Sequence, residues 1–282
     1  MKQKIGKVIK GLIKTTLHFS SRTKFGKYLL NEFVNNAMNQ TRTVKYNGLQ
    51  INLAVPNLLS HWRADTFSSK EPETLEWIDS IPVGSVFWDI GANIGLYSTY
   101  AALARKCKVW SFEPSVFNLE LLARNIFLNG LSDQICIVPI ALSDKLGSSK
   151  LRLTSTDWGG ALSTFGHDFG WDGKAIDQVF EFQTMGLSME DAVNKLSLPM
   201  PDYLKIDVDG IEHIILSGSL EVLKNVKEML IEINDNFQEQ ADQSAEILKR
   251  AGLVLKEKRK SEAVTSNELG DEGTFNQIWV RI

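Results

Sequence analysis

The chain has 282 residues, a hydrophobic content of 43% and a formal net charge of −3. It is long enough for one large globular domain with an appendage. No apolar run approaches the roughly 18 residues that a membrane-spanning helix needs. Residues 1–31 carry eight basic residues and no acidic one, and taking this +8 from the total leaves −11 on residues 32–282. This acidic part of the chain argues against a nucleic-acid substrate, which would require a basic binding surface.

The two cysteines, Cys107 and Cys136, both lie in strand-like apolar runs. They have neither CxxC spacing nor a nearby histidine. We therefore predict two buried, reduced thiols rather than a disulfide or a metal site. This cysteine usage predicts a cytosolic protein.

Residues 1–40 are predicted to form a basic amphipathic helical segment, separate from a single domain over residues 41–282. One helical face carries Ile5, Val8, Ile9, Leu12 and Ile13, and the other carries Lys4, Lys7, Lys10 and Lys14. Such a helix can lie on an anionic membrane surface, or it can pack on the body or on a partner, and the pattern leaves both readings open. It lacks the long apolar core and cleavage site of a secretory signal.

The domain is predicted to begin with a hairpin over residues 44–53, turning at Asn47 and Gly48. A helix follows, with Pro72 in its first turn. Residues 86–95, VFWDIGANIG, then read as a short strand, a glycine turn and the start of a helix near Tyr97. This succession is typical of the first unit of a nucleotide-binding α/β sheet.

The spacing of the glycine turn favours one class of ligand. Its glycines follow the pattern G-x-x-x-G, and Asp89 stands two residues before the first. A dinucleotide fingerprint reads G-x-G-x-x-G, and a carboxylate at Asp89 would repel a pyrophosphate but can pair with an ammonium group. S-adenosylmethionine has an amino-acid part and no phosphate, so the motif favours it over a nicotinamide cofactor. A plain strand-to-helix turn is the alternative.

Further strands are predicted at 109–112, 135–140, 203–208 and 229–233, with a closing pair at 253–256 and 277–282. Residues 150–153 and 179–187 are expected to pair with each other, and residues 157–174 between them are predicted to be a mobile substrate loop. In such a sheet, ligands bind outside the carboxyl ends of the strands. Glu113 ends the second strand about 20 residues after the glycine turn, where a carboxylate accepts ribose hydroxyls.

The fourth strand and its continuation, YLKIDVDG, place Lys205, Asp207 and Asp209 at one strand end. Lys205 and Asp207 alternate with apolar residues and so point to the same face. We predict a catalytic group of Lys205, Asp207 and Glu232, the last from the end of the neighbouring strand. A structural Lys–Asp ion pair is the alternative, and His213 is a weaker candidate for the base.

No metal is expected as part of this site. A hard cation held by Asp207 with Asn234 or Asp235 is a minority alternative, because oxygen ligands end adjacent strands there. The spacing alone does not establish such a site.

Five motifs in order, FWDIGANIG, FEPS, IALSDKLG, YLKIDVDGIEHIIL and LIEIN, resemble those of the FkbM family of S-adenosylmethionine-dependent methyltransferases. The resemblance covers roughly residues 60–282. It implies a Rossmann-like class I fold: an α/β fold with a mostly parallel seven-stranded sheet, an antiparallel last strand and helices on both faces. The family usually has KIDVEG where this chain has KIDVDG, so Asp209 is one methylene shorter than the usual residue.

The resemblance also implies cofactor contacts for the methionine part, the ribose and the adenine of S-adenosylmethionine. The implied residues are Asp89, Gly91, Ala92, Asn93, Gly95, Glu113, Pro114, Ala141 and Leu142. The implied reaction is O-methylation of a hydroxyl on a sugar, a glycan or another small natural product. The alternatives are a nicotinamide-dependent oxidoreductase, weakened by the absent G-x-G, and a non-catalytic cofactor-binding protein docked on a membrane or partner.

Overall fold

The computed structural model describes residues 11–18, 20–260 and 273–282. Its centre is a seven-stranded sheet in the order β12-β13-β11-β10-β3-β4-β5. The strands are β3 (Val86–Ile90), β4 (Lys108–Phe112), β5 (Ile135–Val138), β10 (Tyr203–Ile206), β11 (Glu228–Asn234), β12 (Leu253–Arg259) and β13 (Thr274–Arg281). Strands from β5 to β11 run parallel, and β13 is antiparallel to both of its neighbours. The predicted fold class is confirmed.

Helices cover both faces of this sheet because each strand alternates its side chains between two cores. Within β3, Phe87 belongs to one core and Trp88 to the other. The Phe87 face is covered by α4 (Pro72–Ser80), α5 (Leu96–Arg105) and α6 (Val116–Leu128). The Trp88 face is covered by α7 (Met189–Leu196), α8 (Glu212–Ser217), α9 (Leu220–Leu223) and α10 (Gln238–Arg250).

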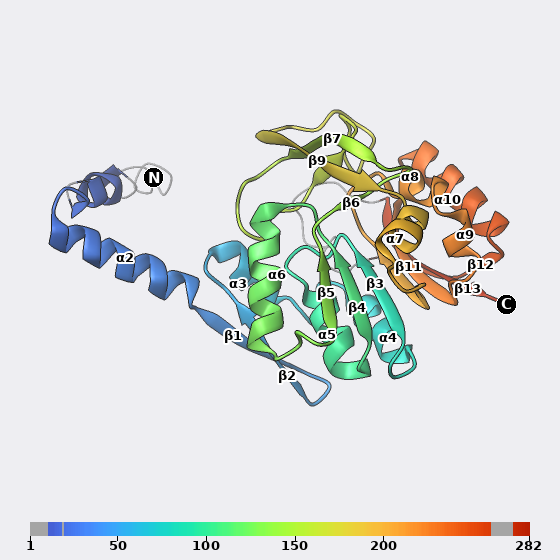
Figure 1. Ribbon diagram of the computed structural model, residues 1–282, viewed down its shortest axis with the longest axis horizontal. Helices are drawn as coiled ribbons and strands as arrows, with labels where there is room; N and C mark the ends of the chain where they lie inside the picture. Colours follow the sequence, from blue (N-terminus) through green and yellow to red (C-terminus); the bar gives the residue numbers. More distant parts are fainter. Residues whose placement is uncertain (1–10, 19, 261–272) are drawn as a thin grey trace.

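A second sheet of four strands has the order β6-β9-β7-β8 (Figure 1). Its strands are β6 (Ala141–Leu142), β7 (Gly147–Leu153), β8 (Ser163–Phe165) and β9 (Phe180–Leu187). The antiparallel pairing of β7 with β9 confirms the predicted pair. Strand β8 was not predicted: it lies inside the segment 157–174, which we expected to be a loop.

The predicted hairpin is confirmed as β1 (Thr41–Tyr46) and β2 (Leu49–Ala54), followed by α3 (Leu58–Asp65). Its turn residues Asn47 and Gly48 both have positive φ, as a two-residue hairpin turn requires. Helix α2 (Lys24–Met38) precedes the hairpin and extends away from the body (Figure 1). Most of the predicted amphipathic pattern, from Lys4 to Lys10, lies outside the described residues.

One prediction about the cysteines needs correction. Cys107 is buried as predicted, but Cys136 is exposed. Cys136 lies on β5, the edge strand of the large sheet, whose middle residues Cys136 and Ile137 are not fully covered. Both thiols are free. In the described part of the chain, no helix is both long enough and apolar enough to cross a membrane.

Candidate active site

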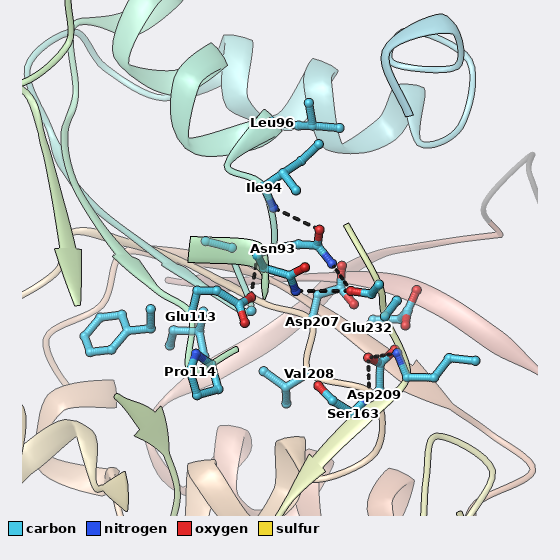
Figure 2. A pocket seen from close by; sticks show the side chains of 18 of the residues that line it. Asn93, Ile94, Leu96, Glu113, Pro114, Ser163, Asp207, Val208, Asp209 and Glu232 are labelled. Carbon is cyan, nitrogen blue, oxygen red and sulfur yellow. Dashed lines mark hydrogen bonds between the residues drawn. The ribbon is translucent and has the colours of Figure 1, made fainter. Parts of the chain in front are cut away.

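A cavity of about 920 Å³ opens at the carboxyl ends of β3, β4 and β10. Its wall comes from the glycine turn after β3, the strand ends, the second sheet and the connection between α3 and α4. Figure 2 shows Asp207, Asp209 and Glu232 close together on one side, with Glu113 and Pro114 on the other. This is the edge at which ligands bind to sheets of this type.

The glycines of the turn are required by chain packing. Gly91 has φ +80°, and a Cβ there would lie 1.9 Å from the backbone oxygen of Asp207. Gly95 has φ +77°, and its Cβ would lie 2.3 Å from Cδ1 of Leu122. The structure thus shows close approach of two strand ends and of a neighbouring helix at this turn, and Gly91 also lines the cavity.

All but two of the predicted cofactor residues line the cavity: Gly91, Ala92, Asn93, Glu113, Pro114, Ala141 and Leu142. The exceptions are Asp89 and Gly95. Asp89 is buried within β3 and accepts a hydrogen bond of 2.5 Å from Oγ of Ser98. Burial raises the pKa of Asp89, and the charge of Lys205 opposes that shift. Asp89 therefore lies behind the cavity wall, because β3 extends through Ile90 and keeps the Asp89 side chain inside the body.

Glu113 is held by the backbone at the end of β4. One carboxylate oxygen accepts the N–H of Asn93 at 2.8 Å, and the other accepts the N–H of Ser115 at 2.7 Å. The residue is only 5% exposed, and burial raises its pKa to about 7 although the two N–H groups oppose that shift. The Asn118 side chain also lowers the pKa of Glu113 by hydrogen bonding, and a carboxylate with about four acceptor sites still has capacity for a ligand. Glu113 thus fits a ligand that donates hydroxyl hydrogen bonds.

Lys205 and Asp207 form an ion pair of 2.8 Å, and Lys205 is 1% exposed. Burial by itself would lower the pKa of Lys205, but the charges of Asp207, Asp89 and Glu71 outweigh burial and raise it. The ammonium group also lies 5.0 Å from the ring centre of Tyr97. Lys205 therefore stays charged and cannot serve as a general base; it holds Asp207 in place.

Glu232 lines the cavity on the same side as Asp207 (Figure 2). Burial raises its pKa well above the usual value, and the charges of Asp207 and Glu71 add to the shift. Among the described residues Glu232 has no ion pair with Lys205, which pairs with Asp207. A partly buried carboxylate that binds a proton tightly is typical of an acid–base group.

Sequence reasoning missed the contribution of the connection between α3 and α4. Lys70 and Glu71 from this connection and Arg63 from α3 line the cavity, and Lys70 and Glu71 form an ion pair. Burial would raise the pKa of Glu71, but Lys70 and Lys205 lower it to about 2. In the sequence these charged residues precede the helix that we predicted at Pro72, and we gave them no role in the site.

The segment 157–163 is hydrogen-bonded to the cavity wall. Asp209 accepts the backbone N–H groups of Leu162 at 2.7 Å and Ser163 at 3.3 Å. The side-chain amides of Asn93 and Asn118 donate to the carbonyl oxygen of Gly160 at 2.8 and 3.1 Å. The shorter Asp209 thus reaches this segment, and burial raises its pKa to about 6.

His213 does not line the cavity. It opens α8, is buried, and packs against Phe169 and Phe237. For the alternative cation site, Asp235 is ion-paired with Lys258. In the described part of the chain, no group of three or more His, Cys, Asp or Glu side chains is placed to hold a metal ion.

The model of the FkbM methyltransferase domain matches residues 89–255, more than half of the chain. The chain belongs to the FkbM methyltransferase family. This FkbM protein is an enzyme that uses S-adenosylmethionine, and the oxidoreductase alternative is not favoured. The residues lining the cavity fit that cofactor, with a buried carboxylate at Glu113 for hydroxyls and an apolar wall at Ala141 and Leu142.

This methyltransferase is similar to hexuronic acid methyltransferase AglP of Haloferax volcanii. The two are 22% identical over 198 residues, covering 70% of this chain and 76% of AglP. Among solved structures, FkbM of Methylobacillus flagellatus has a TM-score of 0.45 at 15% identity, covering 70% of this chain and 43% of that one. TYW2 of P. horikoshii has a TM-score of 0.49 at 12% identity, covering 85% and 70%. Neither structural likeness bears on the acceptor.

Proposed function

We propose that this enzyme methylates a hydroxyl group of a sugar, within a glycan or a small acceptor. The observation that carries the proposal is the group of Lys205, Asp207 and Glu232 beside the cavity that fits the cofactor. An O-methyltransferase must remove a proton from a neutral hydroxyl, and carboxylates placed at the reacting centre perform that step. The similarity to a hexuronic acid methyltransferase supports a sugar as the acceptor.

The cofactor is assigned to the glycine-turn side of the cavity. Glu113 would accept hydrogen bonds from the ribose hydroxyls, and Pro114, Ala141 and Leu142 would form the apolar wall for the adenine. The backbone from Gly91 to Asn93 would hold the methionine part. S-adenosylmethionine supplies the methyl group as an electrophile on its sulfonium. Asp89 does not contact the cofactor, because its side chain is buried. Its negative charge instead favours the charged form of Lys205.

The proposed mechanism divides the work among three side chains. Lys205 is a fixed cation that holds one carboxylate oxygen, Oδ2, of Asp207. The other oxygen of Asp207 is then available to orient the acceptor hydroxyl, which makes productive geometry more frequent. Glu232 takes the hydroxyl proton, and its raised pKa makes it a stronger base than an ordinary carboxylate.

The test is acceptor-dependent formation of S-adenosylhomocysteine from S-adenosylmethionine. A panel of neutral sugars, uronic acids and cell-envelope glycans should contain acceptors that stimulate product formation, and catechol-type and amine acceptors should not. Stimulation only by non-sugar acceptors would overturn the sugar assignment. Equal turnover with every acceptor would count against a specific acceptor-binding site in this cavity.

We also propose that residues 1–40 attach the domain of residues 41–282 to the inner face of an anionic membrane. Residues 1–31 carry eight cations and no acid. Each basic residue near such a surface contributes about 1 kcal/mol of binding free energy. Helix α2 adds large exposed side chains, with Phe25 at 72% and Phe33 at 71% exposure, and it extends away from the body (Figure 1).

Vesicle co-sedimentation tests this attachment on the full-length chain. The enzyme should sediment with anionic vesicles at low salt and should be released at high salt. A variant with Lys4, Lys7, Lys10 and Lys14 changed to Gln should remain in the supernatant. Changing Lys106 and Lys108 on the body to Gln is the control and should have little effect. Equal sedimentation of all three proteins would refute membrane attachment through this segment. The segment would then pack on the domain or bind a partner.

A further inference from the structure

Among the described residues, three cationic side chains line the cavity, and they differ in how their charge is compensated. Lys70 is ion-paired with Glu71, and Lys205 is ion-paired with Asp207. Arg63, from α3, has no carboxylate within ion-pair distance among the described residues. Arg63 is therefore the cation of the described cavity wall whose charge lacks a direct partner.

The guanidinium of Arg63 is fixed at one edge and unused at the other. Its Nε donates to the carbonyl oxygen of Gly159 at 2.9 Å. Gly159 has φ +82°, and a Cβ at that position would lie 3.4 Å from the same Nε, so the backbone approaches the arginine closely. Nη1 and Nη2 donate to none of the described residues. These two nitrogens form the fork that binds a carboxylate through two parallel hydrogen bonds.

The surroundings explain why a ligand charge is needed there. Burial lowers the pKa of Arg63, while the charges of Asp209, Glu71 and Asp207 oppose that shift from a distance. Each of those acids already has closer partners: Glu71 has Lys70, Asp207 has Lys205, and Asp209 accepts two backbone N–H groups. A partly desolvated charge without a direct counter-ion is costly, and a carboxylate from a ligand offsets that cost.

We propose that Arg63 binds a carboxylate of a ligand inside the cavity through its two free terminal nitrogens. Two ligands of this enzyme can bring that group: the methionine part of the cofactor, or an acidic sugar as acceptor. The second source rests on the proposed function; the first does not. Arg63 is then a specificity-determining residue for whichever ligand carries the carboxylate.

The cofactor arm of the test compares two ligands that differ in the amino-acid part. S-adenosylhomocysteine carries the carboxylate, and 5′-methylthioadenosine lacks it. If the cofactor is the source, Arg63→Gln weakens S-adenosylhomocysteine binding by about tenfold to a hundredfold, the range for a hydrogen-bonded charge. Binding of 5′-methylthioadenosine stays within about threefold. Calorimetry measures both constants without turnover.

The acceptor arm compares an acidic sugar with its neutral counterpart, glucuronate with glucose or matched glycosides. If the acceptor is the source, Arg63→Gln raises the KM for glucuronate by about tenfold or more, leaves the KM for the neutral sugar unchanged, and leaves S-adenosylhomocysteine binding unchanged. Arg63→Lys keeps the charge without the fork and should recover only part of the loss. Arg42→Gln is the control, since Arg42 pairs with Asp65 on the surface.

Selectivity for the carboxylate in either arm supports the proposal and names the source. If Arg63→Gln changes both members of each pair equally, or changes none, Arg63 acts only through its bond to Gly159 and the proposal is overturned. Failure of every sugar to accept a methyl group would count against the proposed function alone. The comparison of S-adenosylhomocysteine with 5′-methylthioadenosine would then decide the role of Arg63 by itself.

Discussion

Replacing Glu113 should disable cofactor binding more than any other single change in the glycine-turn half of the cavity. If its carboxylate accepts both ribose hydroxyls, Glu113→Ala removes two hydrogen bonds to a charged group. Each such bond contributes about 1.5 kcal/mol or more, so the loss is about 3 kcal/mol or roughly 150-fold in affinity. The variant also removes the acceptors of the Asn93 and Ser115 N–H groups, which lowers stability.

Glu113→Gln separates these two effects, because it keeps one oxygen acceptor for the backbone and removes the charge. Titration calorimetry with S-adenosylhomocysteine should give a large loss of affinity for both variants, with a smaller drop in melting temperature for Glu113→Gln. Glu120→Ala is the matched control, since Glu120 is exposed on α6 and pairs with Arg124. Unchanged affinity in a folded Glu113→Ala protein would refute the assignment of the ribose to this residue.

The raised pKa of Glu113 adds a dependence on pH. Its pKa in the folded protein is about 7 against 4.5 for an ordinary glutamate, so ionisation costs stability. The contribution of Glu113 to the free energy of unfolding therefore decreases as pH rises from about 4.5 through 7. Cofactor affinity changes in the opposite direction, because the ionised carboxylate is the better acceptor. It should weaken as pH falls below 7, and this dependence should vanish in Glu113→Gln.

Four further substitutions test the rest of the site. Asp207→Asn and Lys205→Met should each lower the transfer rate by more than tenfold while S-adenosylhomocysteine binding stays within about threefold, which single-turnover assays and calorimetry would show. Normal transfer rates in both variants would show that Lys205 and Asp207 are not part of the catalytic site. Glu232→Gln should lower the rate by a similar factor and remove the rise in rate with pH that the raised pKa of Glu232 predicts; an unchanged pH profile would exclude it as the base. Gly91→Ala should lose about 3 kcal/mol, or 6 °C or more in melting temperature, because a Cβ would meet the backbone of Asp207. Gly48→Ala, at a similar φ but with open space, should lose about 1 kcal/mol, and equal losses would refute the clash.

The sequence was sufficient to predict the sheet and most of its ligand edge. Strands β3, β4, β10 and β11 are short apolar runs bounded by glycine or acidic residues. This pattern predicts the strands and their ends well, because parallel strands are buried on both faces and so are apolar along their whole length. The polar residues that follow them then meet at one edge. Glu113 and Asp207 were found by this rule alone.

The rest of the site depends on contacts between segments far apart in the chain. Arg63 and Glu71 reach the cavity because α3 and α4 fold over the strand ends, and no periodicity marks that position. Asp89 was assigned to the ligand because it precedes a glycine turn, but its side chain points to Ser98 within the body. Asp209 is one methylene shorter than the family's usual residue, and the sequence did not show that it lines the cavity and accepts the N–H groups of Leu162 and Ser163.

The most direct measurement follows the methyl group itself. The enzyme would be incubated with S-adenosylmethionine labelled with ¹³C at the methyl carbon and with the acceptors that stimulate turnover, and the product examined by NMR. The structure predicts a labelled methoxy carbon on a sugar ring, formed by the wild-type enzyme and by Arg42→Gln but at least tenfold more slowly by Asp207→Asn and Glu232→Gln. Label on nitrogen or carbon, or equal rates in all four proteins, would contradict the assignment of this cavity as a sugar O-methyltransferase site.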